Sequence, residues 1–280
     1  MELNDKLTVV PENFSLDAVR ELFTTYGAVF LPRFLPEHDI SLVTSHISEL
    51  VRIQLELVSP AATRPSDYNY LVDGILELAA RDRNKVGSVY DAAMKMLSVR
   101  ALGLTEPVQE LVRHVLSSNL LAMSNNIIVR IDLKGEEERL FGWHQDYPYS
   151  MVSQHGAVVW TPLTPVTADV GPVQVLPYSH RNGIRKLTID HRRHLNIRDD
   201  EYIDSLPPPV AFECVPGDVV LFNVLSLHRS SPNVSAIPRW SVTFRYCDMT
   251  DEHSLQRGWP TFYTQGRHFK DVYPELITEK

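Results

Sequence analysis

The second half of the chain carries several short strand-like segments. A parallel sheet would need helical crossovers between such segments. After about residue 120, runs of β-branched and aromatic residues are separated by Gly, Pro, Asp and Asn, a pattern typical of short strands joined by turns. The runs are NNIIVRIDL, GAVVWTPL, GPVQVLP, GDVVLFNVL and RWSVTFRY. Because no convincing helical period lies between them, the sequence favours a mainly β sandwich or jelly roll over a parallel α/β sheet.

The first part of the chain is predicted to be helical. Residues 15–26 place apolar side chains on one helical face, with Ser15 as the N-cap and Gly27 as the stop. A short strand, GAVFLPRFLP, follows, and further helical periodicity covers residues 37–58, 69–83, 88–99 and 106–117. We therefore predict one domain, 1–280, in which α-helices and an initial strand (about 1–118) buttress a jelly-roll core (about 119–250), followed by a C-terminal tail (251–280).

Composition narrows the class of protein. The 280 residues include 35 acidic and 27 basic side chains, a net charge of −8, and 44% are hydrophobic. An acidic chain without an arginine-rich arm is a poor candidate for nucleic-acid binding. Two cysteines, Cys214 and Cys247, cannot build a disulfide framework, so we expect a reducing, cytoplasmic setting. Neither a leader-like N-terminus nor an apolar run of about 20 residues is present, so no membrane partner is expected.

One short motif offers metal ligands. In the run Trp143-His144-Gln145-Asp146-Tyr147, residues two apart in an extended strand would face the same side. His144 and Asp146 would then present an imidazole and a carboxylate to one ion, with Gln145 pointing away. The motif is short enough to arise by chance, so it needs support from elsewhere in the chain.

That support comes from a later histidine and an arginine. The apolar run GDVVLFNVLSLH ends at His228, and two histidines with one carboxylate form the facial triad of non-haem Fe(II) oxygenases. A 2-oxo acid would chelate such an iron and would need a buried partner for its far carboxylate. Arg239 opens the next strand and shares a face with Ser241; its planar guanidinium suits a carboxylate.

These motifs resemble those of the phytanoyl-CoA dioxygenase family of Fe(II)- and 2-oxoglutarate-dependent oxygenases. The segments that carry the resemblance are GAVFLPRFLPEHDI, RDRNKVGSVYDA, IIVRIDL, GWHQDYP, WTPLTPVTADVGPVQVLPYSHR and LHRSSPNVSAIPRWSVTFRY. They run through most of the chain and keep the order found in the family. One departure is Tyr178, which replaces a glycine of the family's turn. The sequence predicts either a turn without positive φ there or local strain.

The resemblance implies the site residues and the fold. The fold would be a double-stranded β-helix, a cupin-like jelly roll. The implied cofactors are Fe(II), 2-oxoglutarate as cosubstrate and O2. The implied catalytic iron ligands are His144, Asp146 and His228, and the implied cosubstrate contacts are Arg239, Ser241, Trp160 and Asn126.

The implied reaction is hydroxylation of an unactivated C–H bond of a small molecule, with release of succinate and CO2. The carboxylate at Asp146 favours hydroxylation, although desaturation, epimerisation and ring closure use the same triad. Two competing hypotheses are a non-catalytic jelly roll that binds a ligand and a zinc hydrolase. The triad together with Arg239 argues against the first, and the second gives Arg239 no role. Neither the substrate nor the oligomeric state can be read from the sequence.

Several side chains around the triad have weaker assignments. Phe141, Tyr147 and Tyr149 flank the metal motif. They are candidate substrate contacts, or they simply close the mouth of the sandwich. Arg130 and Arg245 are expected in internal ion pairs more than in substrate binding. The basic stretch 181–198 is predicted to be a solvated loop, and a substrate lid is the competing hypothesis.

Overall fold

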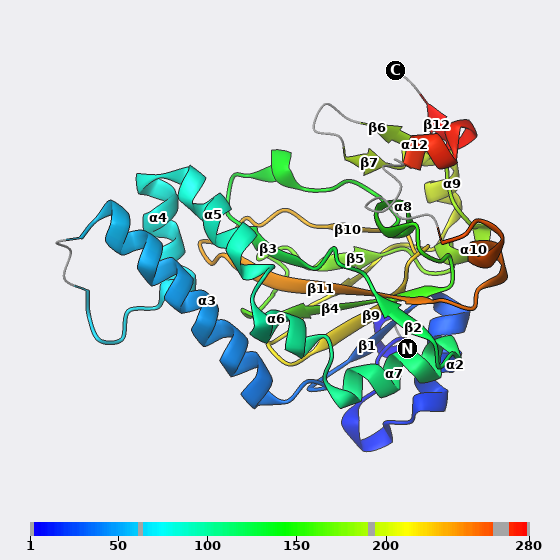
Figure 1. The fold of residues 1–280 in the computed structure, drawn as a ribbon, viewed down its shortest axis with the longest axis horizontal. Coiled ribbons are helices and arrows are strands. Elements are labelled where there is room, and N and C mark those ends of the chain that lie inside the picture. Colours follow the sequence, from blue (N-terminus) through cyan, green and yellow to red (C-terminus); the bar gives the residue numbers. More distant parts are fainter. Residues whose placement is uncertain (1–2, 61–63, 190–193, 260–268, 279–280) are drawn as a thin grey trace.

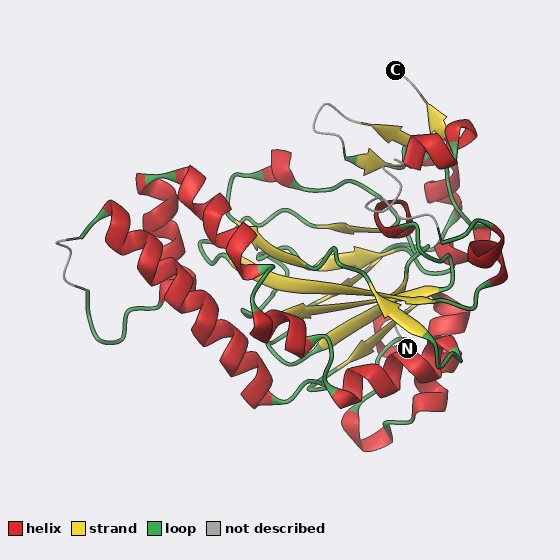
Figure 2. Ribbon diagram, viewed as in Figure 1, coloured by secondary structure: helices red, strands yellow, loops and turns green. Residues whose placement is uncertain are grey.

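A six-stranded antiparallel sheet forms the centre of the molecule (Figures 1 and 2). The computed structural model describes residues 3–60, 64–189, 194–259 and 269–278. The strand order of the central sheet is β1 (Ala28–Leu31), β9 (Val219–Asn223), β4 (Gly156–Pro162), β11 (Arg239–Asp248) and β2 (Leu121–Met123), with β3 (Ile128–Asp132) also paired to β11. The long strand β11 joins three neighbours and carries the polar residues singled out in the sequence.

Two smaller sheets complete the β-structure. The first contains β10 (His228–Ser230), β5 (Val173–Val175) and β8 (Val210–Phe212), all antiparallel. The second contains β12 (Ile277–Thr278), β6 (Leu187–Ile189) and β7 (Leu195–Asn196), in which β12 and β6 are parallel. The core is therefore built from antiparallel sheets, as predicted, with one short parallel pair at its periphery.

Helices from the first part of the chain cover one face of the central sheet (Figure 1). They are α2 (Leu16–Tyr26), α3 (Glu37–Val58), η2 (Tyr70–Gly74), α4 (Ile75–Arg81), α5 (Arg83–Ala93), α6 (Leu97–Leu102) and α7 (Glu106–Leu116). The remaining described helices are α1 (Leu3–Lys6), η1 (Pro11–Asn13), η3 (Glu137–Arg139), α8 (Tyr147–Ser150), η4 (Ser179–Asn182), α9 (Asp200–Ser205), α10 (Glu252–Gln256), α12 (Phe269–Val272) and η5 (Pro274–Leu276). Across the described ranges, no helix is both long and apolar enough to cross a membrane.

Two hydrophobic clusters lie on opposite faces of the central sheet. Trp240, Val242 and Phe244 belong to the cluster under the helices, and the Trp240 ring nitrogen donates to the Leu71 carbonyl at 2.7 Å. The second cluster joins Trp160 and Phe222 of the central sheet to strands β5 and β8. Because side chains alternate along a strand, the polar residues of β11 face this inter-sheet space.

The sequence located the main elements but missed the short ones. All five predicted strands are present, as β3, β4, β5, β9 and β11, and the initial strand is β1. The N-cap assignment is weaker than expected, because the Ser15 side chain makes no capping hydrogen bond. The segment 69–83 is a π-helix followed by an α-helix rather than one helix. Strands of two or three residues, such as β7 and β10, carry too little alternation to be recognised.

A sharp turn joins α2 to β1 and rules out a side chain at Gly27. Gly27 has φ +80°, and a Cβ atom there would lie 2.3 Å from His180 Nδ1. The His180 Nε2 atom also bonds the Thr24 carbonyl at 3.1 Å, so this histidine helps to hold the turn. Across the turn, Tyr178 takes φ 66°, so of the two alternatives predicted for this position the turn without positive φ is wrong.

We expect Gly27→Ala to lower the free energy of unfolding by about 2 kcal/mol or more. The cost combines a left-handed backbone with the collision against His180. Gly87→Ala is the control, because a Cβ at this helical position meets nothing within 4 Å. There the change should stabilise the protein by about 0.5–1 kcal/mol. Urea unfolding of the two variants tests the prediction, and equal effects would contradict it.

Candidate active site

Three buried side chains converge at one end of the inter-sheet space. His144, Asp146 and His228 each offer one ligand atom, and these atoms lie within 4.8 Å of one another. Asp146 Oδ1 is 3.9 Å from His144 Nε2 and 3.8 Å from His228 Nε2. Two imidazoles and one carboxylate on one side of a shared point form a donor set suited to Fe(II).

Backbone hydrogen bonds fix which ring nitrogens face this point. His144 Nδ1 is 2.9 Å from the Gly142 carbonyl, and His228 Nδ1 is 3.0 Å from the Ser226 carbonyl. A carbonyl only accepts, so both Nδ1 atoms carry the proton and both Nε2 atoms keep a lone pair. Bonds of this kind orient metal-binding histidines and raise their basicity.

The two histidines are held together by strand pairing. The His144 amide donates to the His228 carbonyl, and the His228 amide donates to the His144 carbonyl, both at 3.1 Å. Asp146 departs from the predicted extended geometry. Its backbone is in the right-handed helical region and leads into α8, while its amide donates to the Val224 carbonyl at 3.0 Å. A turn, rather than strand alternation, therefore brings the carboxylate beside the imidazoles.

The side chain between the two ligands braces the turn. Gln145 is fully buried and points away from the triad, as predicted. Its Nε2 donates to the carbonyls of Gly183 and Leu225 at 2.8 and 2.7 Å, and its Oε1 accepts from the Arg185 amide. The metal motif is thus tied to two other loops.

The electrostatics leave the triad ready to accept a cation. Burial raises the pKa of Asp146, but Arg245 and the two histidines outweigh it and hold the pKa at about 2. Burial and the neighbouring His228 lower the pKa of His144 to about 3, and burial lowers that of His228. Asp146 Oδ2 is buried with no hydrogen-bond partner among the described residues. A buried carboxylate oxygen beside two neutral imidazoles fits a metal ion.

We expect the metal-free protein to lose stability as the pH falls from 7 to 5.5. The folded pKa of His144 lies below its ordinary value, so the unfolded chain takes up more protons in this window. His144 alone should contribute a loss of about 1.3 kcal/mol, with a further loss from His228. Urea unfolding in EDTA measures the effect. His144→Gln should flatten the dependence, and an unchanged slope in that variant would contradict the prediction.

A cavity of about 100 Å³ opens beside the triad. Its walls include nine of the residues singled out in the sequence: His144, Asp146, His228, Asn126, Trp160, Phe141, Tyr149, Arg130 and Arg245. Tyr147 does not line it. That side chain is packed in the second hydrophobic cluster, where its hydroxyl bonds the Tyr273 hydroxyl at 2.6 Å.

Arg239 and Ser241 are buried at the start of β11, before Thr243 and Arg245, which line the cavity. Arg239 is only 1% exposed, and its Nη2 donates to Asp132 Oδ2 at 2.7 Å. Ser241 Oγ is buried with no partner among the described residues. Neither residue lines the cavity beside the triad. The structure therefore keeps the Arg239 head group out of solvent but pairs it with a carboxylate of the chain.

Other arginines follow the prediction of internal ion pairs. Arg245 Nη2 bonds Asp146 Oδ1 at 2.8 Å, and Arg130 Nε bonds Asp132 at 3.0 Å. In the basic stretch, Arg185 pairs with Asp199 and Arg181 donates to the Thr25 carbonyl at 2.7 Å. The prediction of a solvated loop is wrong in part, because the stretch contains strands β6 and β7. The substrate lid stays a prediction, and Arg192 and Arg193 lie outside the described residues.

Sequence reasoning missed part of the cavity wall. Tyr90 comes from α5 and lines the cavity beside the triad, yet its helix showed only a weak apolar period. Thr243 also lines it and could have been found, because it alternates with Ser241 and Arg245 along β11.

Comparison with known proteins gives matches over most of the chain. The family profile described as phytanoyl-CoA dioxygenase (PhyH) matches residues 23–241. The 1-deoxypentalenic acid 11-beta-hydroxylase of Streptomyces exfoliatus is 33% identical over 247 residues, covering 84% of this chain and 81% of that protein. The Streptomyces arenae protein of the same name is 33% identical over 105 residues, and the match spans only 35% of its length.

Solved structures share the fold at low sequence identity. EctD from S. alaskensis, solved with 2-oxoglutarate and 5-hydroxyectoine, has a TM-score of 0.57 at 19% identity, covering 83% of this chain and 76% of that one. The epimerase SnoN from nogalamycin biosynthesis, solved with Fe3+ and alpha ketoglutarate, has a TM-score of 0.56 at 17% identity, covering 83% of each chain.

Proposed function

Because this chain belongs to the phytanoyl-CoA dioxygenase family of Fe(II)- and 2-oxoglutarate-dependent oxygenases, we propose that it hydroxylates an unactivated C–H bond of a small molecule. It is a 2-oxoglutarate-dependent dioxygenase that uses Fe(II), 2-oxoglutarate and O2. The convergence of His144, Asp146 and His228 is the observation that carries the proposal. The Streptomyces exfoliatus relative, which matches over 247 residues, is a hydroxylase, and this adds support.

We also infer that residues 1–280 form one domain whose core is a double-stranded β-helix. Two antiparallel sheets share one hydrophobic cluster, and strands far apart in sequence, such as β1 and β9, are neighbours. Both features are those of a jelly roll buttressed by helices on one side. Similarity to EctD and SnoN in overall fold agrees with this assignment.

In this proposal the triad holds the iron. His144 and His228 bind it through Nε2, and Asp146 binds it through its carboxylate. When bound, the iron with 2-oxoglutarate and O2 supplies the oxidising power, and 2-oxoglutarate leaves as succinate and CO2. The chain's own contribution is orientation: the Nδ1 bonds fix both rings, and Arg245 holds Oδ1 of Asp146 while Oδ2 has no partner among the described residues.

Arg239 and Ser241 are proposed to bind the far carboxylate of 2-oxoglutarate. Both are buried, and the Ser241 hydroxyl lacks a hydrogen-bond partner within the described part of the chain. Asp132 is shared by Arg130 and Arg239, so Arg130 can retain that carboxylate when Arg239 turns toward the cosubstrate. Trp160 and Asn126, which line the cavity beside the triad, would flank the cosubstrate.

Anaerobic titration with Fe(II) and 2-oxoglutarate tests the proposal. A weak visible metal-to-ligand charge-transfer band is expected with Fe(II) and not with Zn(II), and air should then release succinate. Absence of the band would overturn the assignment. Once a substrate stimulates succinate release, mass spectrometry of the product formed under ¹⁸O2 separates the reactions. Hydroxylation adds labelled oxygen, whereas epimerisation, desaturation and ring closure leave the product unlabelled.

A further inference from the structure

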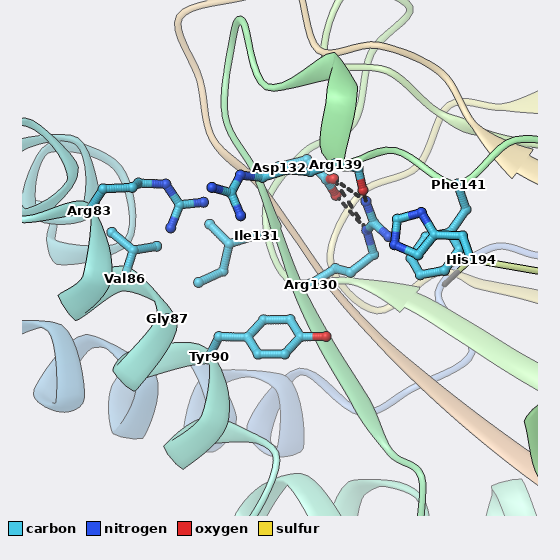
Figure 3. A pocket seen from close by; sticks show the side chains of 10 residues that line it. All are labelled: Arg83, Val86, Gly87, Tyr90, Arg130, Ile131, Asp132, Arg139, Phe141 and His194. Atoms are coloured by element: carbon cyan, nitrogen blue, oxygen red, sulfur yellow. Dashed lines mark hydrogen bonds and ion pairs between the residues drawn. The ribbon is translucent and has the colours of Figure 1, made fainter. Parts of the chain in front are cut away.

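A second cavity adjoins the one beside the triad. Its volume is about 290 Å³, and Tyr90, Arg130 and Phe141 line both this cavity and the one beside the triad. Figure 3 shows its lining side chains, which come from helix α5, strand β3, η3 with the following Phe141, and His194 before β7. We call it the outer cavity. A molecule bound alongside these three shared residues would extend from the outer cavity into the cavity beside the triad.

Arginines dominate the polar lining of the outer cavity. Arg83, Arg130 and Arg139 line it, against one lining carboxylate, Asp132 (Figure 3). Arg83 forms a two-point pair with Glu136, at 2.5 and 2.7 Å. Among the described residues, Arg139 has only long contacts to carboxylates, 3.5 Å to Glu136 and 3.6 Å to the half-exposed Glu138.

The ion pairs around this cavity depend on the cosubstrate. Among the described residues, Arg130 and Arg239 share the single buried carboxylate of Asp132. With Arg239 assigned to the cosubstrate carboxylate, Arg130 keeps Asp132 and Arg83 keeps Glu136. Arg139 is then the lining arginine with the weakest pairing, because its contacts to carboxylates are 3.5 Å or longer, and its N–H donors are available to an anion.

Apart from His194, the rest of the lining is largely apolar. Val86, Ile131, Phe141 and the ring of Tyr90 form these walls. A small molecule that fits the cavity would therefore combine an apolar body with one negative charge. A carboxylate matches the planar fork of arginine.

We infer that the outer cavity binds the carboxylate of an apolar-bodied acid substrate, with Arg139 and Arg83 as its specificity-determining partners. This inference rests on the proposed function, because the body of the acid would extend past Tyr90 and Phe141 to the triad. Arg239 and Ser241 remain assigned to the cosubstrate, so the two carboxylates occupy different positions.

Calorimetric titration of a matched pair of probes tests the inference. Adamantane-1-carboxylate and the neutral adamantane-1-carboxamide are added to the protein loaded anaerobically with Fe(II) and saturating 2-oxoglutarate, which keeps the cosubstrate position filled. We expect the carboxylate to bind at least about 10-fold more tightly than the amide, because a charge-assisted hydrogen bond is lost with the amide. Arg139→Gln should weaken carboxylate binding about 10-fold and leave amide binding unchanged.

Arg81→Gln is the matched control. The Arg81 side chain is 46% exposed and that of Arg139 is 48% exposed, but Arg81 lies outside the cavity and pairs with Glu77. Arg83→Gln is a second test variant and should also weaken carboxylate binding. If Arg83→Gln fails to fold because it loses the ion pair with Glu136, Arg139→Gln alone carries the test. Absence of carboxylate binding, equal affinity for both probes, or an unchanged affinity in Arg139→Gln would overturn the inference. Failure of the proposed function is distinguishable, because the charge-transfer band would then be missing before any probe is added.

Discussion

Asp146→Ala is expected to abolish 2-oxoglutarate turnover, with a loss of more than about 100-fold. Loss of a group that merely orients a metal ligand typically costs about 10–100-fold, and Asp146 is proposed as a ligand itself. The same change should remove the charge-transfer band of the Fe(II) and 2-oxoglutarate complex. Succinate release and the anaerobic visible spectrum measure the two effects.

The control for Asp146→Ala must separate a loss of catalysis from a loss of folded protein. Asp146→Ala leaves Arg245 buried without its carboxylate partner, and removal of one member of a buried pair costs about 3–5 kcal/mol. The double variant Asp146→Ala, Arg245→Met removes both charges and should regain most of that stability. If the double variant folds and stays inactive, the loss lies in the iron site. Full turnover in either variant would show that the ligand assignment is wrong.

Arg239→Gln should raise the KM for 2-oxoglutarate by about 30-fold or more. Truncation of one partner of a buried, hydrogen-bonded charge pair costs about 2–5 kcal/mol, and kcat at saturation should change far less. The iron triad is untouched, so affinity for Fe(II) should stay the same. Steady-state kinetics over a wide range of cosubstrate concentration separates the two constants.

A cosubstrate without the far carboxylate sharpens this test. Wild-type protein should prefer 2-oxoglutarate strongly over 2-oxopentanoate, which has the same chain length and no second carboxylate. Arg239→Gln should lose most of that preference. Arg130→Gln removes the second partner of Asp132 and should lose less of the preference, because the guanidinium of Arg239 is still present. A full preference for 2-oxoglutarate that persists in Arg239→Gln would contradict direct binding by Arg239.

The fold was predictable where strands are long and their faces differ. β11 alternates Trp240, Val242 and Phe244 with polar residues, and the structure places the apolar set under the helices. Short edge strands such as β7 and β10 were not predictable. Their pairing depends on partners distant in sequence, and two or three residues carry no period.

The identity of the site was more predictable than its geometry. The resemblance to the family is confirmed, and the three predicted triad residues do converge. Local sequence could not predict that Asp146 sits in a turn, because its amide bonds Val224 from a distant segment. The same holds for Arg239, whose partner Asp132 is contributed by the neighbouring strand β3. Tertiary partners decide both positions.

The reciprocal backbone bonds between His144 and His228 have a consequence for the life cycle of the enzyme. Strand pairing, not the ion, sets the spacing of the two imidazoles, so little ordering remains to be done when metal arrives. Chelation should therefore strip iron and leave a folded, reloadable protein, unlike small zinc domains that unfold without their ion. The fraction of sites that hold iron can then follow the local concentration of ferrous iron, and the metal-free chain stays folded.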